Sequence, residues 1–142
     1  MKLLNSLPEI DAASATLAIR NGIAIETDDL ITLSGFAGID FKTRAISDGP
    51  FGKHAHDSID TFEYILKSMG LSLDHVVKVR CFLQEPVRDF PEWNAIFKER
   101  FSAPYPCRTT VGAPLVVGLI EVEMTVARTA RRDAQAFAIT GV

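Results

Sequence analysis

The run LIEVEMTVAR, from Leu119 to Arg128, decides how this chain folds. Apolar and polar residues alternate along it, which is the period-two pattern of a strand with one buried face. The residues predicted to face a core are Ile120, Val122, Met124 and Val126, and those predicted on the opposite face are Glu121, Glu123 and Thr125. A long strand of this kind needs neighbours, so we expect a sheet.

Other segments supply those neighbours. VVKVRCFL, from Val76 to Leu83, also alternates, which predicts a second long strand. Its faces are predicted to carry Val77, Val79, Cys81 and Leu83 on one side, and Lys78, Arg80 and Phe82 on the other. Nearer the start, residues 22–26 and 30–34 flank the turn residues Thr27, Asp28 and Asp29, and this arrangement predicts a hairpin.

Two amphipathic helices are predicted between the strands. DSIDTFEYILKSMG, residues 57–70, has apolar residues at helical spacing and ends at Gly70. The second helix is predicted from about Asp89, with Pro91 in its first turn and its end before Pro104. The predicted apolar stripes are Ile59, Phe62, Leu66 and Met69 in the first helix, and Trp93, Ile96, Phe97 and Phe101 in the second. Two helices cover one face of a sheet, so the semi-polar second face favours self-association.

Length and composition limit the classes of protein. The chain has 142 residues, of which 47% are apolar and 23% charged, so we expect one domain over residues 1–142, with a lead (1–20) and a tail (129–142). No apolar run approaches the roughly 18 residues of a membrane span, and the first residues lack a signal-peptide pattern, so a cytoplasmic protein is expected. The net charge of -3 argues against nucleic acid as a partner.

Metal and thiol chemistry are not expected. Cys81 and Cys107 lack CxxC spacing, which predicts free thiols. His54, His56 and Asp57 are metal-ligand types, but they come just before the first predicted helix, where the two imidazoles would diverge and Asp57 could serve as a cap.

One arginine, Arg108, stands at the head of an otherwise uncharged run. Because a guanidinium is costly to bury, an arginine in such surroundings either meets solvent, for instance by capping a strand, or binds an anionic partner. The residues alone leave both interpretations open.

Several segments together resemble the RidA/YjgF family of enamine and imine deaminases. In order, they are SGFAGID (34–40), DSIDTFEYILKSMGLSLDHVVKVRCFL (57–83), FPEWNAIFKERF (90–101), YPCRTTVG (105–112) and LIEVEMTVA (119–127). The resemblance implies an α+β, chorismate-mutase-like fold, with a mixed sheet, two helices on one face and a trimeric barrel. It also implies active sites between the subunits of a homotrimer or dimer of trimers, a small carboxylate-bearing enamine as substrate, and neither a metal nor a cofactor.

The resemblance also assigns roles to residues. Arg108 matches the ligand of the substrate carboxylate, and Glu121 matches the glutamate that holds the attacking water. Thr110 corresponds to the position that lends main-chain groups near the reacting nitrogen. Ser34 and Asn94 match positions that line or support the pocket.

One departure from the family bears on the substrate. Many members carry a pocket tyrosine thirteen residues before the Ser-Gly pair, where this chain has Asn21 beside Arg20. An added arginine suits a second carboxylate, and Arg131 and Arg132 of the tail are further candidates. We therefore expect a 2-aminomuconate deaminase that yields 4-oxalocrotonate. The alternatives are a general 2-iminoacid or 2-aminoacrylate deaminase, and a non-enzymatic ligand-binding or regulatory trimer; a ribonuclease is disfavoured by the acidic balance.

Overall fold

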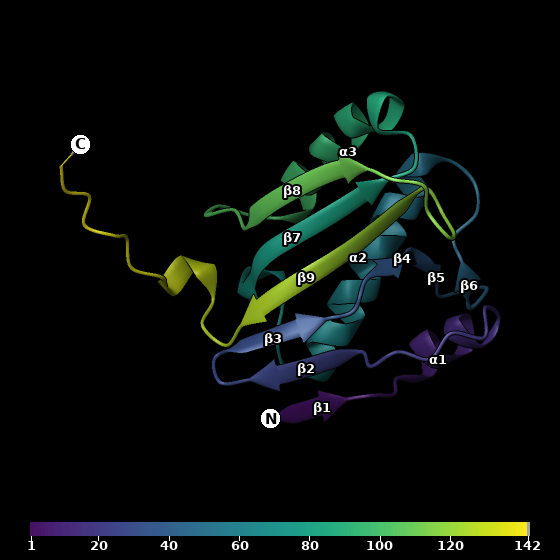
Figure 1. Ribbon diagram of the computed structural model, residues 1–142, viewed down its shortest axis with the longest axis horizontal. Helices are drawn as coiled ribbons and strands as arrows, with labels where there is room; N and C mark the ends of the chain where they lie inside the picture. The colour runs from purple at the N-terminus through teal and green to yellow at the C-terminus, as the bar shows by residue number, and fades with distance from the viewer. Residues whose placement is uncertain (142) are drawn as a thin grey trace.

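A computed structural model describes residues 1–141 of the chain as a mixed seven-stranded sheet with helices packed on one face (Figure 1). The strand order is β1-β2-β3-β9-β7-β8, β4 pairs with β9, and β5 and β6 form a separate two-stranded sheet. This α+β architecture confirms the predicted fold class. The elements are β1 (Lys2–Leu4), α1 (Pro8–Ala15), β2 (Ala24–Thr27), β3 (Leu30–Leu33), β4 (Phe36–Ala37), β5 (Ile39–Asp40), β6 (Ala45–Ile46), α2 (Phe51–Ser68), β7 (Val76–Leu83), α3 (Pro86–Arg100), β8 (Cys107–Gly112) and β9 (Ile120–Ala127).

The predicted hairpin is present as β2 and β3. The two strands pair antiparallel from Ala24 opposite Leu33 to Thr27 opposite Leu30. Asp28 has a φ of 45°, a backbone conformation that aspartate tolerates better than most residues in a tight hairpin turn.

The two long strands form the centre of the sheet. β7 pairs antiparallel with β9 and parallel with β8. The predicted inward residues of β9, which are Ile120, Val122, Met124 and Val126, are all buried. In β7 the prediction was wrong at Val77: a register irregularity between Val76 and Lys78 leaves Val76 fully buried and Val77 only half-buried. A bulge adds one residue to a strand and so shifts the alternation by one position.

Helix α2 begins earlier than predicted. Gly49, at a φ of 95°, and Pro50 lead into the first helical residue, Phe51. The buried stripe therefore starts at Phe51, and His54, His56 and Asp57 lie inside the helix instead of before it. Asp57 is consequently not a cap.

Helix α3 also begins earlier than predicted, at Pro86 instead of about Asp89, so that Pro91 lies inside the helix. The N–H that Pro91 lacks would have bonded the carbonyl of Val87, a residue that is 95% exposed, and water can satisfy such a carbonyl. The helix ends at Arg100, before Pro104, as predicted.

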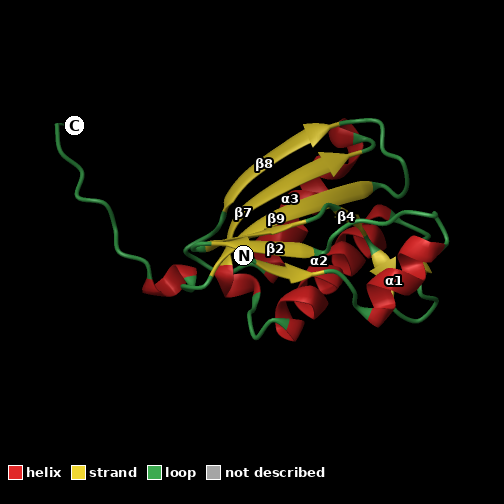
Figure 2. Ribbon diagram, turned by 60° about the horizontal axis from the view of Figure 1, so that its bottom comes forward, coloured by secondary structure: helices red, strands yellow, loops and turns green. Residues whose placement is uncertain are grey.

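Residues 1–20 are more structured than the predicted lead. They contain strand β1, which pairs with β2, and helix α1, which brings the helices to three instead of the two predicted. Helix α1 lies beyond one end of the long strands of the sheet (Figure 2) and packs beside β6. Its only buried residues are Ile10 and Ala13, a stripe too short to stand out as helical periodicity.

The core lies between the sheet and helices α2 and α3. Its largest fully buried side chains include Trp93, Phe62 and Met124. Within residues 1–141, none of the helices combines the length and the apolar character needed to cross a membrane.

His54 ties α2 to the segment that leads into β9. The side chain is 5% exposed, and its Nδ1 accepts a hydrogen bond from the backbone N–H of Leu119 at 3.3 Å. Burial lowers the pKa of His54 below its ordinary value of 6.5, because the surroundings disfavour the charged imidazolium. The neutral form therefore holds the chain immediately before Glu121.

We expect the free energy of unfolding to fall as the pH drops below about 6.5, because the unfolded chain then binds a proton that folded His54 resists. His54→Gln retains an acceptor for Leu119 without titrating in this range, so its stability should vary less between pH 7.5 and pH 5. Denaturant titrations of both proteins across this range measure the difference. Parallel loss of stability in the two proteins would contradict this role for His54.

Candidate active site

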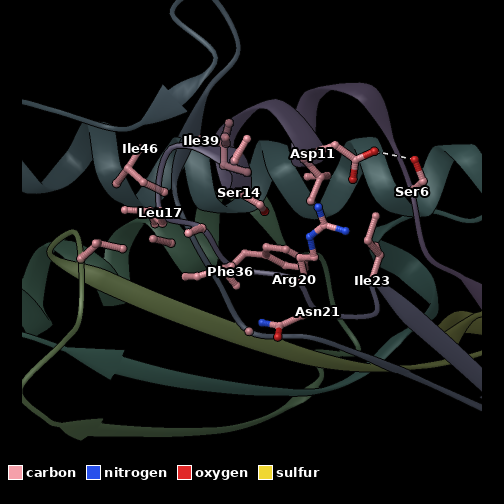
Figure 3. Close-up of a pocket in the computed structure, with 18 of the residues that line it drawn as sticks. Ser6, Asp11, Ser14, Leu17, Arg20, Asn21, Ile23, Phe36, Ile39 and Ile46 are labelled. Carbon is pink, nitrogen blue, oxygen red and sulfur yellow. Dashed lines mark hydrogen bonds between the residues drawn. The ribbon is translucent and has the colours of Figure 1, made fainter.

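A cavity of about 670 Å³ opens between the N-terminal segment and the end of the sheet (Figure 3). More than half of its lining residues come from residues 5–21, and the strand side includes Gly35 of the β3–β4 connection and Glu121 of β9. Arg20 and Asn21 line it with Glu121, so three of the residues singled out from sequence share one cavity. Its volume is ordinary for a small-molecule site.

Glu121 is the acid on the strand side of this cavity. It lies opposite Ala37 of β4 and Phe82 of β7, on the sheet face away from the helices. A Cβ built on Gly35 would lie 3.5 Å from its Oε1 atom, so the glycine leaves open space beside the carboxylate. Within residues 1–141 no cation lies within ion-pair distance of Glu121, whereas Glu123 pairs with Arg80.

Arg108 is held on the opposite face of the sheet. Its Nη2 donates to Oδ1 of Asn94 in α3 at 2.8 Å, and its guanidinium carbon lies 4.5 Å from the centre of the Phe97 ring. Phe90 lies on another side, at 5.7 Å. These contacts fix the guanidinium without neutralising it, because an amide oxygen and an aromatic face carry no net charge. Its buried Nη1 has no hydrogen-bond partner within residues 1–141.

Thr110 follows Arg108 on the same face of β8, two residues along. Its buried Oγ1 likewise has no hydrogen-bond partner among the described residues. Two unsatisfied polar atoms on one strand face are costly unless a ligand or water completes them. Cys81 is its register partner in β7, and burial raises the pKa of this thiol to about 11, which keeps it protonated.

A single chain does not bring Arg108 and Glu121 together. Arg108 is the register partner of Val79, whereas Glu121 pairs with Phe82. These two β7 positions differ by three residues, which places them on opposite faces and about 10 Å apart along the strand.

Ser34 has a supporting position. Its Oγ donates to the carbonyl of Gly22 at 2.5 Å, and its backbone N–H donates to the carbonyl of Ile23. These bonds attach the segment that carries Asn21 to the end of β3. Ser34 therefore holds the backbone behind the cavity wall, and it does not itself line the cavity.

The tail arginines do not reach the cavity. Arg131 is 9% exposed and donates to the backbone carbonyls of Leu73, Val76, Ser102 and Pro104. Arg132 lies 3.7 Å from Asp74. Within one chain neither arginine reaches this cavity, since both lie at the far end of the sheet, where β7 begins.

The histidine segment serves the fold. Asp57 accepts from Ser47 at 2.7 Å and pairs with Lys53, while the Nδ1 of His54 is occupied by Leu119. Among residues 1–141 no three His, Cys, Asp or Glu side chains are grouped as a metal site would require. Cys81 and Cys107 are free thiols, as predicted, the first buried and the second exposed.

Comparison with known proteins identifies the family. The model of the family described as Endoribonuclease L-PSP matches residues 13–129. The chain belongs to this family, which is the RidA/YjgF family. A relative from Dermatophagoides farinae named 2-iminobutanoate/2-iminopropanoate deaminase is 32% identical over 63% of this chain and 69% of its own length. Protein HMF1 of Saccharomyces cerevisiae is 28% identical over 89% of this chain and 95% of its own.

Solved structures agree with this assignment. The crystal structure of RidA from an Antarctic Psychrobacter bacterium superposes with a TM-score of 0.76 at 26% identity, covering 89% of this chain and 99% of that one. The family resemblance read from the sequence is therefore confirmed.

Sequence reasoning missed some residues of the RidA-type site. Phe97 was assigned only to the core, although it also lies against the guanidinium of Arg108. Asp11 fell in the predicted lead (1–20) and was given no role, yet it lines the cavity and accepts a hydrogen bond from Ser6 at 2.5 Å. The spacing of Phe97 three residues after Asn94 was a signal, because both then lie on one side of a helix.

Arg108 and Arg131 provide a matched test of which arginine serves the fold. Arg131→Met should cost about 3 kcal/mol or more of unfolding free energy, because four carbonyls lose their donor. Arg108→Met should cost less than about 1 kcal/mol, because removal of a buried unpaired charge offsets the lost bond to Asn94. Chemical denaturation measures both values. A larger loss for Arg108→Met would assign Arg108 to the fold.

Proposed function

We propose that this protein hydrolyses an enamine or imine of a carboxylic acid to a keto acid and ammonia, at sites shared between copies of the chain. The observation that carries the proposal is the guanidinium of Arg108, which is held by Asn94 and Phe97 and keeps a buried Nη1 without a partner. A carboxylate is the ligand that best completes such a group, through two parallel charge-assisted hydrogen bonds.

Arg108 orients and activates the substrate. Each charge-assisted bond to the carboxylate contributes on the order of 1.5 to 3 kcal/mol. Thr110, on the same strand face, has its Oγ1 free to meet the nitrogen of the substrate or a water beside it. Neutralising the carboxylate also makes the neighbouring C=N carbon more electrophilic and fixes its orientation.

Glu121 supplies the base. The enamine first tautomerises to the imine, and water then adds to the C=N carbon while Glu121 accepts its proton. The nitrogen of the resulting carbinolamine takes that proton back from the same carboxyl group. The C–N bond then breaks as the hydroxyl proton passes through Glu121 to the nitrogen, so ammonia leaves and the C=O of the keto acid remains. Glu121 lines the cavity, so its carboxylate can reach a water held there.

The two halves of the site are proposed to meet between copies. Arg108 and Glu121 lie on opposite faces of one sheet, so one substrate contacts both groups when they come from different chains. We propose a homotrimer or a dimer of trimers, in which the semi-polar sheet face that carries Phe82, Glu121 and Glu123 meets a neighbour.

Complementation tests this arrangement. Arg108→Ala and Glu121→Gln should each be nearly inactive alone, with turnover reduced about 100-fold or more. Co-assembly of equal amounts should restore about a quarter of the native ammonia release, because a cleft that takes one group from each of two chains is fully intact in one case of four.

The matched control is Glu123→Gln, which alters the next acid on the same face, the partner of Arg80. Glu123→Gln should be active alone. A mixture of Glu123→Gln with Arg108→Ala should show no more activity than the Glu123→Gln protein provides by itself. A mixture of the two inactive proteins that remains inactive would contradict the shared site.

The substrate is proposed to be a dicarboxylate, specifically 2-aminomuconate, which would give 4-oxalocrotonate. The cavity of about 670 Å³ has room for more than a three-carbon acid. Arg20 extends its guanidinium into it (Figure 3), and within residues 1–141 no acid lies within ion-pair distance of that group. The relative named for 2-iminobutanoate and 2-iminopropanoate makes a general 2-iminoacid deaminase the alternative.

Removal of Arg20 tests the substrate class. Arg20→Ala should lower kcat/KM for 2-aminomuconate by about 10- to 150-fold, the equivalent of one charge-assisted contact, and should leave 2-aminoacrylate nearly unchanged. Arg132→Ala, which removes an arginine far from the cavity, is the control. A native protein with a higher kcat/KM for 2-aminoacrylate would show that the alternative is correct.

A further inference from the structure

Three buried polar atoms on α3 and β8 have no hydrogen-bond partner within residues 1–141. Two of them, Nη1 of Arg108 and Oγ1 of Thr110, belong to the proposed site, and the third is the indole nitrogen Nε1 of Trp93. Trp93 is fully buried and comes directly before Asn94 in α3. A buried indole N–H usually donates to an acceptor, so the packing of the core does not by itself account for this one.

Cys81 connects Trp93 to Thr110. Its side chain is buried, and it is the register partner of Thr110 in the parallel pair of β7 and β8. Burial raises the pKa of its thiol to about 11, and the side chains of Thr110 and Trp93 lie close enough to oppose that rise. Neither side chain makes a hydrogen bond of normal geometry within residues 1–141. We call these three residues the Trp93 cluster.

The cluster contains more donors than good acceptors. The indole of Trp93 can only donate, and a protonated thiol is a weak donor and a weak acceptor. The hydroxyl oxygen of Thr110 is therefore the best acceptor in the cluster. A hydroxyl oxygen that accepts from its neighbours inside the protein keeps its own hydrogen for a group on another side.

The other side of Thr110 is the place where the substrate would bind. Arg108 lies two residues earlier on the same strand face, which corresponds to a spacing of about 7 Å along the strand. An imino acid carries its nitrogen on the carbon next to the carboxylate. A substrate held by Arg108 through its carboxylate can therefore turn its nitrogen toward the hydroxyl of Thr110.

We propose that Trp93 and Cys81 are positioning residues, which hold the oxygen of Thr110 so that its O–H donates to the nitrogen of the substrate. The assignment rests on the proposed deaminase. A donor at this nitrogen stabilises the negative charge that develops there as water adds to the carbon, until the proton held by Glu121 arrives. Thr110 keeps its own proton throughout. This side-chain role adds to the main-chain role that the family resemblance implies for Thr110.

A double-mutant cycle tests the connection between Trp93 and Thr110. Thr110→Val should lower kcat for 2-aminoacrylate or 2-aminomuconate about 10-fold and leave KM within about twofold, because the bond strengthens in the transition state. Trp93→Phe, which removes the N–H, should lower kcat about threefold alone and should have no further effect in the Thr110→Val background. Equal reductions by Trp93→Phe in both backgrounds would overturn the proposal.

Three further variants separate positioning from packing. Thr110→Ser keeps the hydroxyl and should recover most of the kcat that Thr110→Val loses. Ile96→Val removes a buried methyl group from the same helix and should lower stability with little effect on kcat. Cys81→Ala repeats the test should Trp93→Phe fail to fold. It should lower kcat only when Thr110 is present, and an equal effect in the Thr110→Val background would count against the proposal.

The binding of two stable acids tests the direction of the hydroxyl without turnover. The C=O oxygen of 2-oxobutanoate can accept from Thr110, whereas the ammonium group of 2-aminobutanoate can only donate. In calorimetry the native protein should bind the oxo acid about 10-fold or more tightly than the amino acid, and Thr110→Val and Trp93→Phe should both reduce this preference. The same preference in all three proteins would contradict the proposed orientation.

The outcomes distinguish this inference from the deaminase proposal. Ammonia release by the native protein, with equal effects of Trp93→Phe in both backgrounds, would contradict only the role of the Trp93 cluster. A native protein that shows the expected preference for the oxo acid but releases no ammonia from either enamine would contradict the deaminase and retain the orientation of Thr110. A native protein that binds neither acid would overturn both.

Discussion

The alternation of side chains across β7 and its two neighbours is the constraint on which the site depends. Val79 and Phe82 differ by three positions, so their register partners Arg108 and Glu121 must lie on opposite faces. A one-residue slip of either neighbour would put both groups on one face, but it would also expose the buried side of that strand. The buried face of β9 therefore keeps the acid and the guanidinium apart within each chain.

The sheet was predictable from sequence because alternation is a local signal. The inward residues of β9 and the hairpin of β2 and β3 follow from residue types alone. Helix α1 was not predictable in the same way, because it buries only Ile10 and Ala13 and its stability comes from packing on distant segments. The early starts of α2 and α3 did have a local signal, because Pro50 and Pro86 mark helix boundaries. The predicted boundaries did not take these two prolines into account.

The candidate site shows the same contrast between features that local sequence predicts and features that depend on distant segments. The resemblance of short sequence blocks to the family singled out Arg108, Glu121 and Asn94, and the bond from Arg108 to Asn94 joins two of them. The cavity wall was less predictable, because residues 5–21 meet β9 only after the chain has folded. From the sequence alone, Arg20, Arg131 and Arg132 were equal candidates for binding a second carboxylate. Burial and partners separate them, since Arg131 is bound to four carbonyls while Arg20 stays in the cavity.

The difference between Arg108 and Arg131 also supports the proposal that the site is shared between copies. The guanidinium of Arg131 donates its hydrogen bonds to backbone carbonyls and so stabilises a single chain. Arg108 is instead held by one amide and aromatic rings, which leaves a buried donor open at the cost of stability in the isolated chain. In the proposed assembly, a neighbour that brings Glu121 and a substrate carboxylate to this donor would recover that cost. Under this proposal, binding energy from the substrate would be used where the charge develops, and an isolated chain would keep an arginine that can bind the substrate but has no base within reach.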